Sequence, residues 1–520
     1  MACTKPSLKT LCELKCGENN SRKKMGGEEK SLLTFEELIR AVFGNRIGGV
    51  ASNALCFTSV AIDSRNVKKG SLFIPLIGQN QDGHKFIPQA LAAGASAVFV
   101  TKSVYESSPR EFDSLAEKNL GVFFIAVENN LRALQDAARA YVEKFPSLIK
   151  IGITGSSGKT TTKEILSAIL AQKFRVVSTV GNLNSESGLP LSVFEIREGH
   201  EAGVFEMGMN RENEIAEIAS VLRPNFAIVT NVGTAHIGIL KTREKIAAEK
   251  KNIFSYVTES GIALFPEDDD FAEFLAEGVR GKIVRFGKNS AENFGVKFLE
   301  DLGIGGTRFE IDGNEICLKI PGSHNFQNVL SCIALAKELG LSTQEIIRGI
   351  ENVKLPEGRS QVRKVRVKNG AEIFLMQDCY NANPESMKKA LEFCASIKIP
   401  GRKFFVLGDM KELGECSEIE HARVGEAAAR DDAKFVFFAG SEMRAAFRAL
   451  EENYEKSSCA ISAKYFSGEE NFIEEICRAI LDEIRDGDFL LLKASHSMEF
   501  EKIAEGLREV QGASLGVEGD

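Results

Sequence analysis

Residues 149–164 read IKIGITGSSGKTTTKE, an apolar alternation that breaks at a turn of glycine and serine before a helical pattern begins. The isoleucines within residues 149–153 predict a strand, and the apolar spacing from Thr162 to Ala171 predicts a helix. A loop between a strand and a helix presents free backbone N–H groups and the positive helix end to an anion. This order of elements therefore predicts a phosphate-binding loop.

The loop matches the second half of a Walker A motif, with Ile153 where the first glycine of that motif usually lies. In such a loop the lysine reaches the β- and γ-phosphates of a nucleotide, and the following hydroxyl holds Mg²⁺. A surface turn that contains Gly-Lys-Thr by chance is the alternative, and the flanking strand and helix disfavour it. We therefore expect the phosphates to be bound by Gly155, Ser156, Ser157, Gly158, Lys159, Thr160 and Thr161, with Thr160 also on the metal.

Length and composition describe an ordinary globular protein. With 520 residues the chain has room for three domains at the usual ~150 residues each. A net charge of −8 argues against a nucleic-acid partner bound through a basic face. The chain has no apolar run of about 18 residues, so we expect no membrane insertion. The 11 cysteines lack zinc spacing, and we expect reduced, buried thiols in a cytoplasmic protein, as at Cys56, Cys332, Cys394 and Cys477.

Polar side chains follow several apolar runs in the first half of the chain. Asn182 and Asn184 come after a strand predicted at 174–177, and Glu206 and His236 come after later apolar runs. In a parallel sheet such strand ends converge on the crevice where ligands bind. Glu206 and His236 are therefore candidates to meet a metal and phosphates above Lys159, a role that suits the carboxylate better than the imidazole.

Two further patterns have ordinary interpretations on the residues alone. Ser64 and Arg65 lie in a loop suited to a ligand site, and the alternative is a helix cap with a surface ion pair. The helical segment 243–254, which contains Lys250, reads as a solvated charged face.

Longer motifs lie in the last third of the chain. The most specific is residues 378–387, DCYNANPESM, and PGSHNFQN at 321–328, PEGR at 356–359 and LGDMKELG at 407–414 accompany it. By these motifs the chain resembles the Mur ligase family from about Leu32 to about Gly506. Within that family it resembles the branch that adds D-alanyl-D-alanine rather than a single amino acid.

The resemblance implies an α/β fold of three domains. We expect a small N-terminal α/β domain at 31–128 for the UDP-sugar end of the substrate, and a central P-loop ATPase domain with a mostly parallel sheet at 129–358. A C-terminal Rossmann-like domain at 359–513 would bind nucleotide and D-Ala-D-Ala. Residues 1–30 are expected to be a disordered extension and 514–520 a tail.

The resemblance also implies roles for residues that match the family motifs. Lys159, Glu206, His236 and Lys250 would be catalytic, and the last three with Thr160 would hold Mg²⁺, Lys250 as a carbamate. Nucleotide contacts are expected from the phosphate loop and from His324, Asn325, Asn328, Arg359, Asp378 and Tyr380. Substrate contacts are expected from Ser64, Arg65, Asn182, Asn184, Asn381, Asn383 and Ser386.

The implied reaction is an ATP-dependent ligation through an acyl phosphate. The substrates would be UDP-MurNAc-tripeptide and D-Ala-D-Ala, and the product would be the pentapeptide precursor of peptidoglycan. The enzyme is expected to be a cytoplasmic monomer. The alternatives are a related Mur or folylpolyglutamate-type ligase with another acceptor, a non-catalytic Mur-like binding protein, and, on the loop alone, a P-loop GTPase or kinase. The sequence departs from the family pattern at Ser185, Asn252, Gln377, Cys379, Ala494 and His496.

Overall fold

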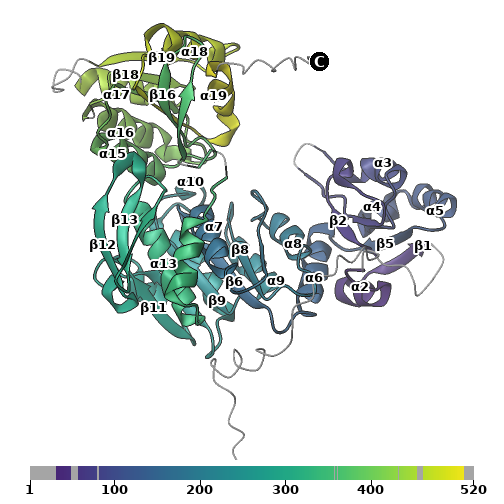
Figure 1. The fold of residues 1–520 in the computed structure, drawn as a ribbon. Helices are drawn as coiled ribbons and strands as arrows, with labels where there is room; N and C mark the ends of the chain where they lie inside the picture. The colour runs from purple at the N-terminus through teal and green to yellow at the C-terminus, as the bar shows by residue number, and fades with distance from the viewer. Residues whose placement is uncertain are drawn as a thin grey trace, which may run out of the picture.

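The computed structural model describes residues 31–48, 57–78, 81–356, 358–359, 361–430, 432–453 and 461–508. In this part of the chain the strands form four sheets, which follow one another along the sequence (Figure 1). The predicted α/β class with mostly parallel sheets is confirmed. The predicted extension at 1–30, the tail at 514–520 and Cys56 lie outside the described residues.

The first sheet has the order β1-β5-β4-β3-β2, with β1 antiparallel to β5 and the other pairs parallel. Helix α2 begins directly after Thr34, because Thr34 and Glu37 form a reciprocal capping box. The strands are β1 (Asn45–Gly48), β2 (Ser59–Ala61), β3 (Ser71–Phe73), β4 (Ala97–Thr101) and β5 (Phe123–Val127). The helices are α2 (Phe35–Val42), η1 (Ser64–Asn66), η2 (Gly83–Phe86), α3 (Ile87–Ala92), α4 (Lys102–Ser107), α5 (Pro109–Lys118) and α6 (Asn130–Val142).

The second sheet is parallel throughout, in the order β11-β10-β9-β6-β8-β7. The predicted strand at its centre is β6, and the carboxyl ends of β8 and β9 lie on either side of it. The strands are β6 (Ile149–Thr154), β7 (Val176–Ser178), β8 (Ala202–Glu206), β9 (Phe226–Val229), β10 (Ile262–Pro266) and β11 (Lys282–Phe286). The helices are α7 (Lys159–Leu170), α8 (Gly188–Val193), α9 (Glu214–Leu222), α10 (Ile237–Leu240), α11 (Arg243–Lys251), η3 (Asn252–Tyr256), α12 (Ala272–Ala276) and η4 (Ala291–Phe294).

Two predicted boundaries in this region are displaced. Helix α7 begins at Lys159 rather than at Thr162, because Gly158 in the left-handed conformation ends the loop and the helix starts directly after it. Strand β7 begins at Val176 rather than at residue 174, because Phe174 still donates a backbone hydrogen bond to the end of α7. The phosphate-loop lysine is therefore the first residue of a helix.

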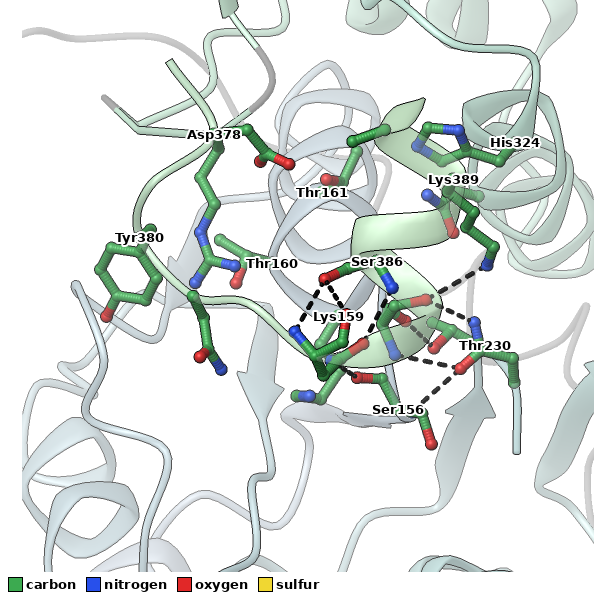
Figure 2. Close-up of a pocket in the computed structure, with 18 of the residues that line it drawn as sticks. Ser156, Lys159, Thr160, Thr161, Thr230, His324, Asp378, Tyr380, Ser386 and Lys389 are labelled. Carbon is green, nitrogen blue, oxygen red and sulfur yellow. Dashed lines mark hydrogen bonds between the residues drawn. The ribbon is translucent and has the colours of Figure 1, made fainter. Parts of the chain in front are cut away.

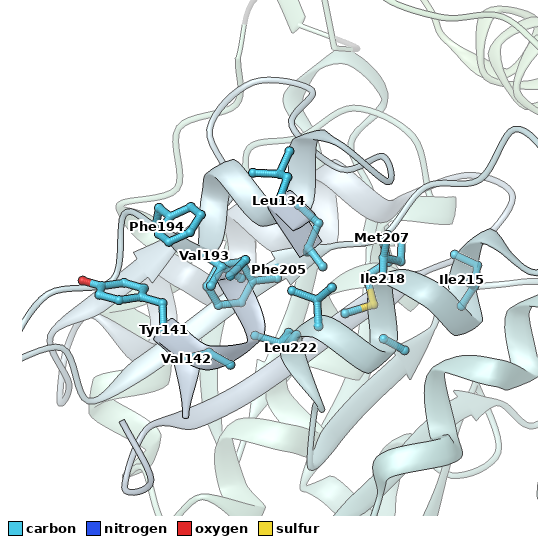
Figure 3. Close-up of a cluster of buried hydrophobic side chains, with 14 of the residues drawn as sticks. Leu134, Tyr141, Val142, Val193, Phe194, Phe205, Met207, Ile215, Ile218 and Leu222 are labelled. Carbon is cyan, nitrogen blue, oxygen red and sulfur yellow. The ribbon is translucent and has the colours of Figure 1, made fainter. Parts of the chain in front are cut away.

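Successive residues of the second sheet point to opposite faces, and each face has its own apolar core. Phe205 and Met207 pack against α6, α8 and α9 (Figure 3). Val204 and Ile228 pack with α7 and α13 on the other face. Because helices cover both faces, the sheet is a rigid platform for the loops at its carboxyl edge.

A three-stranded antiparallel sheet, β12-β13-β14, leads to two helices and then to the fourth sheet. The fourth sheet has the order β15-β16-β20-β17-β18-β19, with only the β15–β16 pair antiparallel. The first group comprises β12 (Val296–Asp301), η5 (Gly303–Gly305), β13 (Thr307–Ile311), β14 (Asn314–Leu318), α13 (His324–Glu338) and α14 (Thr343–Glu351). The strands of the fourth sheet are β15 (Gln361–Arg366), β16 (Glu372–Gln377), β17 (Lys403–Gly408), β18 (Phe435–Ala439), β19 (Ser462–Phe466) and β20 (Phe489–Lys493). Its helices are α15 (Pro384–Ser396), η6 (Gly414–Cys416), α16 (Ser417–Arg430), α17 (Met443–Asn453), α18 (Phe472–Glu483), η8 (His496–Met498) and α19 (Glu501–Leu507).

We call the fourth sheet with helices α15–α19 the C-terminal unit, and the second sheet with its helices the central unit. Figure 1 shows the C-terminal unit above the central unit, with the first sheet on the far side of α6 and α8. The domain boundaries at 128 and 358 remain predictions. Cys332, Cys394 and Cys477 are buried and are not in disulfide bonds, as expected. In the described part of the chain, no helix is long and apolar enough to cross a membrane.

Candidate nucleotide and ligation site

The phosphate loop leaves β6 at Thr154 and enters α7 at Lys159. Both of its glycines are required by close packing. A Cβ at Gly155 would lie 1.8 Å from Thr230 Oγ1, and a Cβ at Gly158 would lie 2.6 Å from Asn328 Oδ1. Both glycines also have positive φ angles, at 155° and 79°.

The loop is held in shape by two residues at the end of β9 that sequence reasoning did not single out. Asn231 Oδ1 accepts hydrogen bonds from the backbone N–H groups of Ser156 and Ser157, each at 3.0 Å. Thr230 Oγ1 donates to the Ser157 carbonyl at 2.5 Å. Their signal in the sequence was a polar pair directly after an apolar strand. With the early loop N–H groups engaged by Asn231, the start of α7 remains the part of the loop that faces an anion.

Lys159 lies folded over this loop, where its Nζ donates to the Gly155 carbonyl at 2.8 Å. Burial lowers the pKa of Lys159, while the nearby carboxylate of Glu206 acts in the opposite direction. The carbonyl is a neutral acceptor, and a phosphate oxygen would be a stronger partner for the ammonium.

Glu206 ends β8 and is 2% exposed. Its two oxygens accept from Thr160 Oγ1 and Asn184 Nδ2, each at 2.8 Å. A threonine hydroxyl beside a carboxylate, next to a phosphate loop, is the oxygen donor set that suits Mg²⁺, which takes few protein ligands and substrate phosphates. Among the described residues, no cluster of three or more His, Cys, Asp or Glu side chains forms a metal cage. The pair thus fits a metal that phosphates help to hold.

His236 directly precedes α10, has the left-handed conformation and faces the C-terminal unit. Its Nδ1 lies 2.8 Å from the carboxylate of Glu412, which leaves Nε2 as the ring nitrogen for another ligand. Burial lowers the pKa of His236, and the contact with His236 lowers the pKa of Glu412. Glu412 was not among the predicted site residues, although the motif that contains it was noted.

Lys250 lies on α11 and is 1% exposed, so the solvated face expected for this segment does not include it. Burial and the charge of Lys159 hold the pKa of Lys250 well below its usual range. Such an environment favours the neutral amine, which is the form that captures carbon dioxide. Its neighbour Glu249 anchors α11 by accepting from the backbone of Asn213 and Ile215 at 2.8 and 2.7 Å.

A cavity of about 360 Å³ lies between the central and C-terminal units, and Figure 2 shows part of its lining. It brings together residues that are up to 340 positions apart in the sequence, from Ser156 to His496. The predicted site residues that line it are Ser156, Ser157, Gly158, Lys159, Thr160, Thr161, Asn182, Asn184, Glu206, His236, His324, Asn325, Asn328, Arg359, Asp378, Tyr380, Asn381, Asn383 and Ser386. Gly155, Lys250, Ser64 and Arg65 are not part of this lining.

The first turn of α13 forms one wall of the cavity. Asn325 Nδ2 donates to the Pro321 carbonyl at 2.7 Å, and Asn328 Nδ2 donates to Asn325 Oδ1 at 2.9 Å. Burial, followed by the charge of Lys389, lowers the pKa of His324 to about 4. The imidazole is therefore neutral at pH 7.

Aromatic stacking and an ion pair form the opposite wall. The Arg359 guanidinium lies 3.8 Å from the centre of the Tyr380 ring, and His496 stacks on Tyr380 with ring centres 5.5 Å apart. Asp378 pairs with the buried Lys493 at 2.5 Å. His496, one of the departures from the family pattern, therefore contributes a ring face to this wall.

Other departures from the family pattern have structural explanations. Gln377 accepts from Arg508 Nη2 at 3.1 Å, and Ala494 is buried in the core of the C-terminal unit. Burial raises the pKa of Cys379 to about 12, so it is an inert thiol. Asn252 caps the end of α11.

Two residues expected to contact substrate also have local structural roles. Asn383 and Ser386 form the capping box of α15, with each side chain bonded to the other's backbone N–H. Asn383 Nδ2 also donates to the Ser156 carbonyl at 3.4 Å. The start of α15 is thus docked on the phosphate loop.

Ser64 and Arg65 lie in η1, which follows β2 of the first sheet. Ser64 Oγ donates to Gln89 Oε1 at 2.9 Å, and Arg65 pairs with Asp63 at 2.5 Å on the surface. The cap of η1 is Asp63 rather than Ser64, so only the surface ion pair of the alternative is confirmed. The substrate role of Ser64 and Arg65 remains a prediction.

Three family models match successive parts of the chain. They are described as Mur ligase family, catalytic domain (residues 57–142), Mur ligase middle domain (153–336) and Mur ligase, glutamate ligase domain (358–496). The UDP-N-acetylmuramoyl-tripeptide–D-alanyl-D-alanine ligase of Treponema pallidum is 42% identical over 478 residues, which cover 92% of this chain and 99% of that one. The ligase of the same name from Bacillus subtilis is 32% identical over 86% of this chain and 93% of its own length.

Solved structures agree with these relatives. A crystal structure of MurF from Acinetobacter baumannii superposes with a TM-score of 0.76 at 26% identity, covering 91% of this chain and 98% of that one. MurF ligase from Thermotoga maritima in complex with ADP gives a TM-score of 0.70 at 29% identity, over 86% of this chain and 96% of that one. Sequence motifs, fold and relatives thus agree, and the chain belongs to the Mur ligase family, in the branch of the UDP-N-acetylmuramoyl-tripeptide–D-alanyl-D-alanine ligases.

Proposed function

We propose that the chain joins D-alanyl-D-alanine to UDP-N-acetylmuramoyl-tripeptide with the cleavage of ATP to ADP and phosphate, giving the pentapeptide precursor of peptidoglycan. One observation carries the proposal. The phosphate loop with Lys159 and Glu206 opens into the same cavity as the Asp378–Ser386 segment. That segment is the part of the sequence that resembles the D-Ala-D-Ala-adding branch.

The reaction needs activation because a carboxylate is a poor electrophile. An oxygen of the tripeptide carboxylate forms a bond to the γ-phosphorus while the bond from that phosphorus to the β-γ bridging oxygen breaks and ADP leaves. The amine of D-Ala-D-Ala then bonds to the acyl carbon, loses a proton, and phosphate leaves. Catalysis is therefore mainly positioning and charge stabilisation, and no protein side chain forms a covalent intermediate.

The chain's own residues have distinct tasks in these steps. The backbone N–H groups at the start of α7 and the Lys159 ammonium neutralise charge that builds up on the transferred phosphoryl group. Arg359 offers a second cation from the opposite wall, held by its stacking on Tyr380. The cavity between the two units keeps water from the acyl phosphate.

Magnesium belongs to the proposal as a bound group that lowers the negative charge of the triphosphate. Thr160 and Glu206 would hold it at the phosphate loop, and His236 with carbamylated Lys250 would support it nearby. For the carbamate, the neutral Lys250 amine bonds to the carbon of carbon dioxide and loses a proton, which converts a cation into an oxygen anion. The depressed pKa of Lys250 supports this step.

Substrate recognition is divided along the chain in the proposal. Ser64 and Arg65 would meet the UDP-sugar end, Asn182 and Asn184 the peptide, and Asn381 with the α15 cap the D-Ala-D-Ala. The enzyme would act as a monomer in the cytoplasm, where ATP and nucleotide-linked precursors are present.

The test is phosphate release from ATP and magnesium with UDP-MurNAc-tripeptide, with and without D-Ala-D-Ala, followed by mass analysis of the product. The expected result is release that depends on both substrates and yields UDP-MurNAc-pentapeptide. The assay is run with two tripeptide substrates, which differ in the diamino acid at position three. A folded, nucleotide-binding protein that releases phosphate only with another acceptor would point to a different amide ligase, and no release with any acceptor would point to a binding protein.

A further inference from the structure

Helix α15 belongs to the C-terminal unit, yet one of its lysines reaches the phosphate loop of the central unit. Lys389 Nζ donates to Ser157 Oγ at 3.3 Å, across 232 positions of sequence. The same ammonium pairs with Glu385, one helical turn earlier, at 2.8 Å. Figure 2 shows Lys389 on the α15 side of the cavity near His324 and the loop.

The charges of the cavity lining leave an excess of cations. Lys159, Arg359, Lys389 and Lys493 face two carboxylates, Glu206 and Asp378. Lys493 pairs with Asp378, and Lys389 pairs with Glu385, which lies just outside the lining. Lys159 and Arg359 then face only the carboxylate of Glu206 within the lining. This excess matches a ligand with several negative charges.

The present partner of Lys389 on the loop is a weak acceptor. Ser157 Oγ is neutral, already accepts from Asn231 Nδ2 at 2.8 Å, and lies at the long end of the hydrogen-bond range from Lys389. An ammonium gains more from a phosphate oxygen than from a hydroxyl, because both partners are then charged. With 28% of its side chain exposed, Lys389 has room to turn from the hydroxyl to a ligand in the cavity.

We propose that Lys389 binds the polyphosphate of ATP from the C-terminal unit, so that tight nucleotide binding requires this unit to be docked on the central unit. The proposal rests on the ATP dependence of the proposed function. It adds a second lysine to the phosphate site, supplied by a different part of the chain from Lys159. Because Lys389 lies near the phosphates only when the C-terminal unit is docked, the affinity for ATP depends on the closed arrangement. In that arrangement the acyl phosphate is shielded from water.

The experiment measures equilibrium binding of ADP and of a non-hydrolysable ATP analogue by calorimetry, with Lys389→Met as the test variant. Lys388→Met is the matched control, because Lys388 lies one residue earlier on the same helix, is 73% exposed and pairs only loosely with Glu392 at 3.7 Å. We expect about tenfold weaker binding of both nucleotides for Lys389→Met, no change for Lys388→Met, and partial recovery for Lys389→Arg. The loss should shrink as salt rises, since it comes from charge.

Adenosine distinguishes direct phosphate contact from a disturbed domain arrangement. It lacks phosphates, so its affinity, measured by ligand-observed NMR, should be the same in the wild-type protein and in Lys389→Met. An equal loss for adenosine would show that Lys389 acts by holding the two units together and would overturn the proposal, as would ADP binding within twofold of wild type. Because the measurement is equilibrium binding, a failed ligation assay leaves it interpretable, and the two proposals fail separately.

Discussion

Gly238 lies in α10, where the central unit touches the loop before η6 of the C-terminal unit. A Cβ at this position would lie 2.4 Å from the Glu412 carbonyl oxygen, 2.6 Å from the Leu413 carbonyl carbon and 2.7 Å from the Gly414 nitrogen. All three are backbone atoms, so no side chain can rotate away. The loop would have to retreat by about 1 Å to restore ordinary contact distances.

Gly238→Ala is therefore expected to displace the loop that carries Glu412 without unfolding the central unit. The helical position itself favours alanine by up to about 1 kcal/mol over glycine, which partly offsets the lost contacts. The contact of Glu412 with His236, 2.8 Å long, would be broken or stretched. A displacement of about 1 Å at a catalytic arrangement costs on the order of 100-fold in rate, or about 2.7 kcal/mol of transition-state stabilisation.

The assay is steady-state phosphate release with both substrates, beside thermal unfolding of the same samples. We expect kcat/KM to fall about 100-fold with a melting temperature within a few degrees of wild type. Gly121→Ala is the control, since a Cβ there meets no atom within 4 Å and its φ is not positive. Turnover of Gly238→Ala within threefold of wild type would refute the reasoning, because the observed docking of the two units would then not be the active arrangement.

Three further changes test the site. Lys159→Ala should lower turnover by at least 1000-fold, or roughly 4 kcal/mol for a partly buried cation at the transferred phosphoryl group, with an unchanged circular dichroism spectrum. Near-normal turnover would remove the basis for the phosphate loop. Lys250→Ala should lose activity and recover part of it with added short carboxylates, and full activity without them would refute the carbamate role. The pKa of His324 is about 4 in the folded protein against an ordinary value of 6.5, so the unfolded chain binds the proton first as pH falls. The stability that neutral His324 contributes is present above pH ~6.5 and is lost as the pH falls towards ~4. The free energy of unfolding, measured by urea denaturation, should therefore depend less on pH in that window for His324→Gln than for the wild-type protein. Parallel pH dependences for the variant and the wild type would contradict the assignment.

Much of the site could be predicted from the sequence because its signals are local. A glycine-serine turn between an apolar alternation and a helical spacing fixes a phosphate loop within about 20 residues. The carboxylate of Glu206 and the histidine at 236 were found because parallel strands end on one edge of a sheet.

Other parts of the site could not be predicted because they depend on how separate units dock. Lys389 looks like any helical surface lysine, and only the tertiary structure brings it within 3.3 Å of Ser157. The burial of Lys250 could not be predicted either. Its charged neighbours in the sequence suggest an exposed helix face, whereas the packing of α11 buries its side chain.

The fold class, the phosphate loop, the family and most of the residues that line the cavity can therefore be inferred from the residues alone, since each is encoded by short-range periodicity, turn chemistry or a contiguous motif. Three features depend on the three-dimensional packing: which cations share the cavity, the contact of Glu412 with His236, and the need for Gly238 to lack a side chain. These features join segments more than 170 positions apart, and their geometry comes from the packing of whole units, which no local pattern specifies.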